Sequence, residues 1–183
     1  MADSRITQKA LANALKELMK EVPFNKITIA DICQYWGMNR KSFYYHFKDK
    51  YDLVNWIFET EFIVPTRQLM EQHPELNEDR WAITAKMCHY FYENKGFYSK
   101  AFKIKGQNCF SEYFRSLTVP TLEAQISSIT DDAQALAFCV DFYADAALIA
   151  LERWIVEKNT MGPDQFVSLL KKSIQLLSYS GDI

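Results

Sequence analysis

No apolar run in this chain of 183 residues is long enough to span a membrane. The first residues, Met-Ala-Asp-Ser-Arg, also do not form the apolar core that a secretory signal peptide requires. We therefore expect a protein that has no membrane partner and works in the cytoplasm. A chain of this length can bury one substantial core or two modest ones.

Cysteine and histidine are few and scattered. The three histidines, His46, His73 and His89, have no spacing that would assemble a zinc site. Each of the four cysteines falls in an apolar helical pattern, which is typical of reduced, buried thiols. Cys88 beside His89, or Cys109, is a conceivable nucleophile, but neither spacing supplies a base and an orienting group. We therefore expect no metal, no cofactor and no enzymatic activity.

Charge is unevenly distributed along the chain, although the net charge is only -2. Residues 1–53 carry a balance of +3, whereas residues 54–183 carry a balance of -5. A basic end on a mildly acidic body orients a protein toward a polyanion and keeps the body away from it. This asymmetry favours a DNA-binding segment in the first third of the chain.

Two short helices separated by a glycine are predicted within residues 24–53. Apolar residues at helical spacing predict the first helix over residues 28–36, with Thr28 and Asp31 forming a capping box. Gly37 supplies the left-handed conformation of a tight turn, and Asn39 caps the second helix, residues 40–47. Such a pair is a helix-turn-helix. Its expected core is Ile29, Ile32, Trp36, Phe43 and Phe47.

The exposed face of the second helix holds no carboxylate. Arginine and lysine neutralise phosphates or donate to guanine edges, hydroxyls bind phosphate oxygens, and aromatic rings pack on sugars and thymine methyls. Asp49 is expected to cap the next helix and to place Lys50 at a helix N-terminus, which favours a phosphate. The alternatives are that the tyrosines cover the core and that His46 is a structural hydrogen-bond donor. The outward-facing residues are Arg40, Lys41, Ser42, Tyr44, Tyr45 and His46.

Several sequence segments in this region match one family at the same relative positions. Thr28-Ile-Ala-Asp-Ile, Gly37-Met-Asn and Phe43-Tyr-Tyr-His-Phe-Lys-Asp-Lys-Tyr-Asp-Leu53 resemble the N-terminal domain of TetR-family transcriptional regulators. The resemblance implies an all-helical homodimer that binds a palindromic operator and is usually controlled by a small molecule. By matching position, it assigns phosphate contacts to Thr28, Tyr44, His46 and Lys50, and base reading to Asn39, Arg40, Lys41, Ser42 and Tyr45.

This sequence departs from the commonest family pattern in two places. Asn39 stands where serine is frequent, and the Arg40-Lys41 pair stands where a small residue or glycine often lies. Both departures fall on the expected base-reading positions. The operator sequence therefore stays open.

The rest of the chain is predicted to be helical. An amphipathic helix over residues 4–21 can pack on the helix-turn-helix, and a long helix from Asp49 crosses into the body as a lever. Pro65 should kink or end that helix, because proline removes an N–H and crowds the carbonyl four residues earlier. We expect it to continue to about residue 72, before a loop at 73–75. Further helices are expected at 79–93, up to about 104, at 107–117, and from Pro120 to 128.

The last third is the expected association surface. A helix capped by Asp132 is small and apolar along one side, and a final helix begins at Gly162-Pro163. The same pair from a second chain would complete a four-helix bundle about a two-fold axis, the symmetry of an operator palindrome. The alternative is that these faces close the core of the monomer. The expected dimer contacts are Leu136, Val140, Ala144, Ala147, Leu148, Leu151, Phe166, Leu170 and Ile174.

Aromatic side chains concentrate between these two ends. In the resembling family an effector pocket occupies this region, and a cavity lined by aromatics suits an organic ligand. An aromatic stripe at helical spacing also forms plain core. The expected pocket lining is Met87, Tyr90, Phe91, Phe102, Phe110, Phe114 and Phe142.

Residues 98–114 are similar to the body of a TetR subgroup that includes the activator of bacterial dihydroxyacetone kinase operons. That subgroup can respond to a partner protein instead of binding a metabolite. The input is thus a small-molecule effector, a co-regulator protein, or neither.

These patterns together predict an all-α protein with a DNA-binding helix-turn-helix domain at residues 1–53 and a helical regulatory and dimerisation bundle at residues 54–183. The predicted function is sequence-specific transcriptional regulation by a homodimer on a palindromic double-stranded DNA operator, under the control of a small molecule or a partner protein. The alternative is a helical protein-interaction module that does not bind DNA. The cations Arg40, Lys41, Lys48 and Lys50 argue against that alternative.

Overall fold

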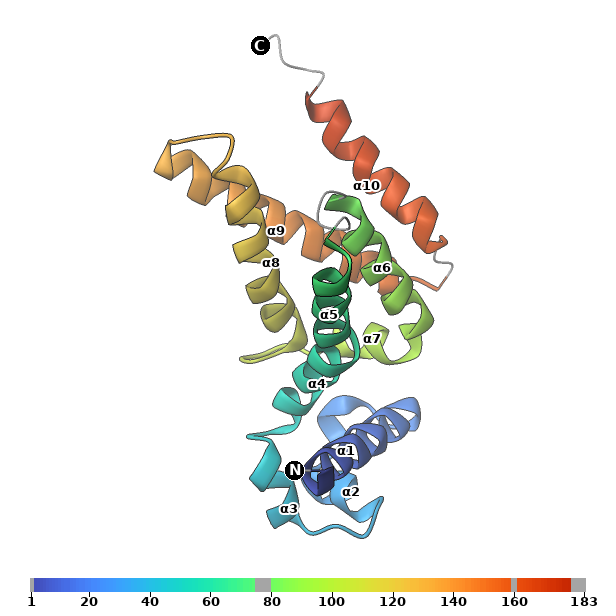
Figure 1. The fold of residues 1–183 in the computed structure, drawn as a ribbon. Helices are drawn as coiled ribbons and strands as arrows, with labels where there is room; N and C mark the ends of the chain where they lie inside the picture. The colour runs from blue at the N-terminus through green and yellow to red at the C-terminus, as the bar shows by residue number, and fades with distance from the viewer. Residues whose placement is uncertain (1, 75–79, 159–160, 179–183) are drawn as a thin grey trace.

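The computed structural model describes residues 2–74, 80–158 and 161–178, and the regular elements within them are helices, which confirms the all-α prediction. In Figure 1, α1 (Ala2–Glu21), α2 (Ile29–Gln34) and α3 (Arg40–His46) form a small unit at one end of the molecule, which we call the reader. The remaining long helices form a larger unit, the body. α4 (Lys50–Phe58) connects the two.

Local hydrogen bonds explain the short reader helices. The Thr28 hydroxyl accepts from the Asp31 N–H, and the Asp31 carboxylate accepts from the Thr28 N–H, so the predicted capping box is present. Gly37 has φ +64°, and the next N–H, of Met38, donates to the Cys33 carbonyl at 2.8 Å. This left-handed residue ends the helix and turns the chain toward α3.

Trp36 is a correction to the predicted reader core. Its side chain is 56% exposed, and its ring contact is an edge-on approach to Tyr35. α2 ends at Gln34, two residues earlier than the apolar spacing predicted, so Trp36 lies in the turn and not on the helix face. Phe43, Phe47 and Ile32 are buried as predicted, against the apolar face of α1.

A π-helical turn, η2 (Glu59–Ile63), joins α4 to α5 (Val64–Gln72). The Val64 N–H donates to the Glu59 carbonyl, five residues earlier, and Pro65 follows in the first turn of α5. A wider turn avoids the clash that a proline ring makes with the carbonyl four residues before it. The predicted effect of Pro65 is therefore confirmed as a restart of the helix, which ends at Gln72 as expected.

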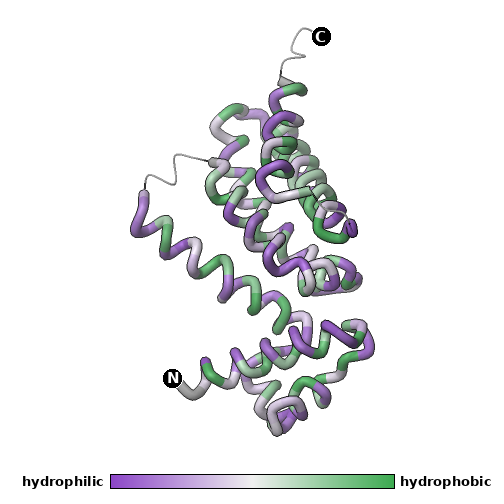
Figure 2. The backbone as a smooth tube through the Cα atoms, turned by 90° about the vertical axis from the view of Figure 1, so that its right-hand side faces the viewer, coloured by the Kyte–Doolittle hydropathy of each residue, from purple (hydrophilic) through white to green (hydrophobic). Residues whose placement is uncertain are grey.

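The body consists of α5 together with α6 (Arg80–Glu93), α7 (Lys95–Ala101), α8 (Phe110–Ile126), α9 (Ala133–Val156) and α10 (Pro163–Ser178). α8 packs along α9, and α10 packs on α6. Figure 2 shows apolar and polar residues alternating along these helices, as expected for helices with one buried face. The expected loop at 73–75 lies partly outside the described residues.

Two expectations for the body are wrong. A break before Pro120 was expected, but α8 continues through it, with the proline exposed and the Thr118 hydroxyl donating to the Phe114 carbonyl at 3.0 Å. α8 packs along α9. Among the described helices, α9 is long and apolar enough by length and composition to cross a membrane, which the sequence analysis did not anticipate.

α9 nevertheless carries the contacts of a helix packed in a protein. Val140, Ala144 and Leu151 are buried, and Asp141 and Asp145 both pair with Arg115 of α8 at 2.6 Å. Two carboxylates paired with one guanidinium fix α9 against α8. The apolar character of α9 thus has a partial explanation in its packing.

Candidate nucleic-acid interface

The outer face of α3 carries the side chains that the sequence predicted to contact DNA. Tyr45 is 82% exposed, Tyr44 is 58% exposed, and Arg40 and Lys41 are exposed beside them. Phe43 is fully buried beneath this face. The helix is therefore anchored by one side and offers cations and phenol rings on the other, which is an arrangement suited to phosphates and base edges.

The start of α3 is fixed by its own polar side chains. The Asn39 carboxamide oxygen accepts from the Ser42 N–H at 2.9 Å and from the Ser42 hydroxyl at 3.3 Å. Asn39 is exposed and Ser42 half-buried, so both remain near the surface. His46 is half-buried, with its ring edge-on to Tyr45 at a centroid distance of 4.9 Å. The cap thus orients the helix N-terminus from which Arg40 and Lys41 project.

Lys50 has a structural contact that the sequence did not indicate. Its Nζ donates to the main-chain carbonyls of Phe24 and Ile27, each at 2.7 Å, and lies 4.4 Å from the Phe24 ring centroid. Desolvation lowers the pKa of this ammonium. The ammonium therefore joins η1 (Phe24–Lys26) to the first residue of α4 by hydrogen bonds. Its predicted phosphate contact stays a prediction that competes with this role.

Thr28 is also occupied by the fold. Its hydroxyl donates to the Asp31 carboxylate at 2.8 Å while accepting from the Asp31 N–H at 3.2 Å. The main-chain N–H and the hydroxyl of Thr28 lower the pKa of Asp31. Thr28 is exposed at the N-terminus of α2, so it still lies on the reader surface. Its phosphate contact is likewise untested.

The expected dimer residues divide into two groups. Val140, Ala144, Leu151 and Phe166 are buried within the single chain, whereas Ala147 is exposed and Ile174 is 47% exposed. The half-buried members are Leu136, Leu148 and Leu170. The alternative left open by the sequence, that these faces close the monomer core, thus accounts for the first group.

A different apolar stripe is exposed on α9. Phe138 is 70% exposed, Phe142 is 54% exposed and Ile149 is 51% exposed. On α10, Leu169 is 46% exposed. The sequence did not predict that this stripe is exposed, because apolar spacing does not tell which of two apolar sides of α9 faces α8.

The expected pocket residues form a closed aromatic cluster. Phe58 of α4 stacks on Phe91 at 5.3 Å and on Phe62 at 5.3 Å, and the rings of Tyr98 and Phe110 pack edge-on against it. Phe91, Phe102, Phe110 and Phe114 are buried in this cluster; Tyr90 and Met87 pack at its edge. The prediction that Phe142 lines the pocket is wrong, because its ring contacts Phe138 and Tyr143 on the exposed side of α9.

Two surface hollows lie away from this cluster. One of about 260 Å³ lies on the surface between α1 and Tyr35, and one of about 270 Å³ lies between α1 and α4, beside Trp56 and Glu61. Neither touches the aromatic cluster. An organic ligand in the predicted site would therefore have to displace packed rings.

The metal and nucleophile candidates of the sequence analysis are not brought together into one cluster in the described part of the chain. Its His, Cys, Asp and Glu residues form no group that could hold an ion. Cys88 is buried, and burial raises the pKa of its thiol to about 12, so the thiolate is disfavoured at neutral pH. The partner of His89 is Asp164 of α10, at 2.8 Å.

A surface reading helix on a short helix-turn-helix, joined to a helical body, is the architecture of a DNA-binding transcription regulator. The model of the bacterial regulatory proteins of the tetR family matches residues 11–57, and the model described as a transcriptional regulator C-terminal region matches residues 79–176. The chain belongs to the TetR family of bacterial transcriptional regulators, which are not enzymes.

A curated relative is the HTH-type dhaKLM operon transcriptional activator DhaS of Lactococcus lactis subsp. lactis strain IL1403. It is 34% identical over 104 residues, which are 57% of this chain and 53% of that protein. The match therefore spans about half the length of the relative.

Solved structures resemble nearly the whole chain. A dihydroxyacetone kinase operon activator, DhaS, has a TM-score of 0.60 and 26% identity, covering 93% of this chain and 97% of its own. A TetR transcriptional regulator from Streptococcus agalactiae 2603V has a TM-score of 0.67 and 19% identity, covering 92% and 93%. The second likeness supports the fold alone.

Proposed function

We propose that this protein is a sequence-specific DNA-binding regulator that works in the cytoplasm as a homodimer on a palindromic operator. The observation that carries the proposal is the outer face of α3. It exposes Arg40, Lys41, Tyr44 and Tyr45, while Phe43 on the other side of the helix is buried. Phosphate contacts would come from the cations and hydroxyls, and base contacts from Arg40, Lys41 and Tyr45. Asn39, Ser42 and His46 complete the proposed surface.

Dimerisation would use the apolar sides of α9 and α10. The exposed stripe Phe138, Phe142 and Ile149, together with Ala147, offers apolar area on α9. Leu169 adds to it on α10, which meets α9 where Trp154 stacks on Phe166. Two copies related by a two-fold axis would bury it in a four-helix bundle. Binding to a palindromic operator would require that axis to place the two α3 helices about 34 Å apart, one turn of B-DNA.

Control would act through the body. A small molecule would have to open the aromatic cluster around Phe58, whereas a partner protein would act from the surface, and both would shift α4 and the spacing of the reading helices. The relatives include an activator of a dhaKLM operon, which supports an operon as the target of this chain too.

The test is selection of bound fragments from the source genome, followed by titration of the selected duplex at about 50 to 200 mM salt. We expect affinity to fall steeply with salt and to be lost when Arg40 and Lys41 are replaced by alanine. Salt-insensitive or absent binding would overturn the DNA proposal and favour a protein-interaction module.

A further inference from the structure

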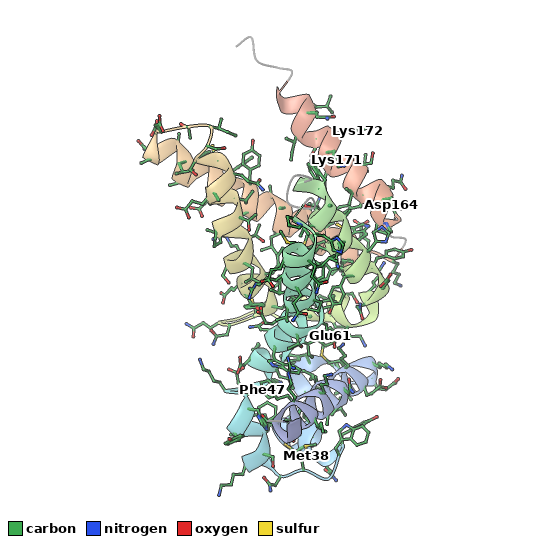
Figure 3. All side chains as sticks on the ribbon, in the orientation of Figure 1. Met38, Phe47, Glu61, Asp164, Lys171 and Lys172 are labelled. Carbon is green, nitrogen blue, oxygen red and sulfur yellow. The ribbon has the colours of Figure 1, made fainter. Side chains whose placement is uncertain are left out.

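In the described part of the chain, the π-helical turn η2 is one of two places where the reader meets the body. The other is α7, where the Lys100 ammonium donates to the Met19 and Lys20 carbonyls at the end of α1. Figure 3 labels Glu61 where the two units adjoin. From the reader, Lys16 of α1 donates to both carboxylate oxygens of Glu61 at 2.6 Å. From the body, the Tyr90 hydroxyl donates to Glu61 at 3.1 Å. One carboxylate thus binds a reader cation and a body phenol.

The chain of hydrogen bonds continues into the buried core. The hydroxyls of Tyr90 and Tyr98 are 2.7 Å apart, and Tyr98 is fully buried. The Tyr90 ring packs against Phe62 at 5.2 Å and against Phe58 at 6.0 Å. Tyr90 therefore belongs both to the aromatic cluster and to the contact with Glu61, so a ring movement in the cluster reaches the carboxylate directly.

The same turn has a second anchor in the body. Glu59 accepts from the Tyr113 hydroxyl of α8 at 2.6 Å. The Thr60 hydroxyl donates to the Trp56 carbonyl at 2.8 Å and to the Ile57 carbonyl at 3.3 Å, which satisfies groups at the start of the wider turn. Single π-helical turns within α-helices occur frequently at functional sites.

The Lys16–Glu61 pair is better suited to orientation than to stability. The side chains are 22% and 35% exposed, and pairs of this kind contribute little to the free energy of unfolding. Lys16 also lies 5.7 Å from the centroid of the Phe97 ring of α7, so its position depends on both η2 and α7. A hydrogen-bonded ion pair between two elements restrains how they sit relative to each other even where its energy is small.

We propose that Glu61 is a positioning residue that transmits the packing of the aromatic cluster, through Tyr90, to Lys16 and so to the angle of α1 and the reader. The effect on DNA affinity rests on the proposed operator binding, whereas the coupling between the cluster and α1 is a property of the free protein. A change in the cluster alters the Tyr90 contact, the π-turn shifts, and α1 moves with Glu61. None of these three residues lies on the outer face of α3.

The first experiment measures binding of a selected genomic duplex by the full chain. Glu61→Gln and Tyr90→Phe should each change affinity by about 3- to 30-fold, and the double variant should change it no more than the larger single effect. The charge-swapped pair Lys16→Glu with Glu61→Lys should restore affinity toward the original value. Additive effects, or wild-type affinity in all variants, would overturn the proposal.

A matched control lies within the reader. Glu17 pairs with Lys20 at 2.7 Å on α1 alone, so Glu17→Gln removes a similar ion pair that does not reach the body. We expect this variant to bind the duplex as the original chain does. An equal loss in Glu17→Gln would mean that any charge change on α1 suffices, which would overturn the assignment to Glu61.

Hydrogen exchange on the free protein separates this inference from the operator proposal. Glu61→Gln should raise amide exchange both in residues 59–66 and in α1, whereas Glu17→Gln should raise it in α1 alone. If the original chain binds no duplex but this pattern is found, the operator proposal fails and the coupling stands. If exchange in α1 is unchanged by Glu61→Gln, the coupling fails whatever the DNA result.

Discussion

The Lys50 ammonium donates to the main-chain carbonyl of Ile27 across 2.7 Å, joining residues 23 positions apart. This contact, with the matching one to Phe24, closes the reader around the start of α4. Shortening the side chain would remove this donor from both carbonyls, although the Phe24 carbonyl would keep the Ile27 N–H at 3.1 Å. Lys50 is therefore part of the framework on which the recognition helix is mounted.

Replacing Lys50 with methionine should lower the free energy of unfolding by about 1 to 3 kcal/mol, because charge-assisted hydrogen bonds to two carbonyls are lost while the aliphatic stem is kept. Urea denaturation followed by circular dichroism measures the change. Lys48→Met is the matched control, since Lys48 is exposed, and should change stability by less than about 0.5 kcal/mol. Equal effects would contradict the structural role of Lys50.

Gly37→Ala should destabilise the protein by about 1 kcal/mol, because φ +64° is unfavourable for a residue with a Cβ. No atom lies within 4 Å of a Cβ built there, so the expected cost is conformational and not steric. Gly96→Ala, in helix α7 and equally open, should instead stabilise by up to about 1 kcal/mol. Thermal denaturation of both variants compares the two signs.

Alkaline pH should destabilise the protein through three tyrosines packed in the body, of which Tyr98 is fully buried. Burial raises the pKa of Tyr90, Tyr98 and Tyr113 above the ordinary value. The unfolded chain therefore releases these protons near pH 10 while the folded chain keeps them, so stability is intact below pH 10 and falls as pH rises above it. Lys50, whose pKa is lowered, acts in the opposite direction below its ordinary value.

The measurement is urea denaturation between pH 8 and about pH 11, with tyrosinate absorbance recorded in parallel. Tyr90→Phe should lose less stability across this range than the original chain does. Tyr45→Phe, on the exposed side of α3, should follow the original curve. A stability that rises above pH 10 would contradict the assigned direction.

Ala147→Glu should yield monomers by light scattering if α9 forms the proposed dimer bundle, since it places a charge on an exposed small residue beside the apolar stripe. Phe142→Glu should act in the same way. Ile6→Glu alters an apolar residue of α1 that is 65% exposed and should leave the association unchanged. A dimeric Ala147→Glu variant would place the interface elsewhere.

Features set by neighbours in the sequence could be predicted, because their hydrogen bonds close over a few residues. The Thr28–Asp31 capping box, the turn at Gly37, and the Asn39 and Asp132 caps are of this kind. The presence of a reading helix followed from the same local signals. Its exposed cations and tyrosines followed from helical spacing alone.

Features set by distant contacts could not be predicted. Lys16 and Glu61 are 45 positions apart, and no local pattern relates them. Trp36 continues the apolar spacing of α2 but lies beyond its end, because Gly37 and Met38 terminate the helix early. Helix spacing also left open which side of α9 packs on α8, and so which apolar residues are exposed.

The π-helical turn before Pro65 determines which face of α5 points into the body. An α-helix advances by about 100° per residue, so the extra residue of a wider turn rotates everything after it by that angle relative to a continuous helix. The side chains of α5 therefore keep a fixed rotation about the helix axis relative to those of α4. Insertion or deletion of a single residue within 59–63 would turn the body's first helix to a different neighbour, although no side chain of either helix had changed.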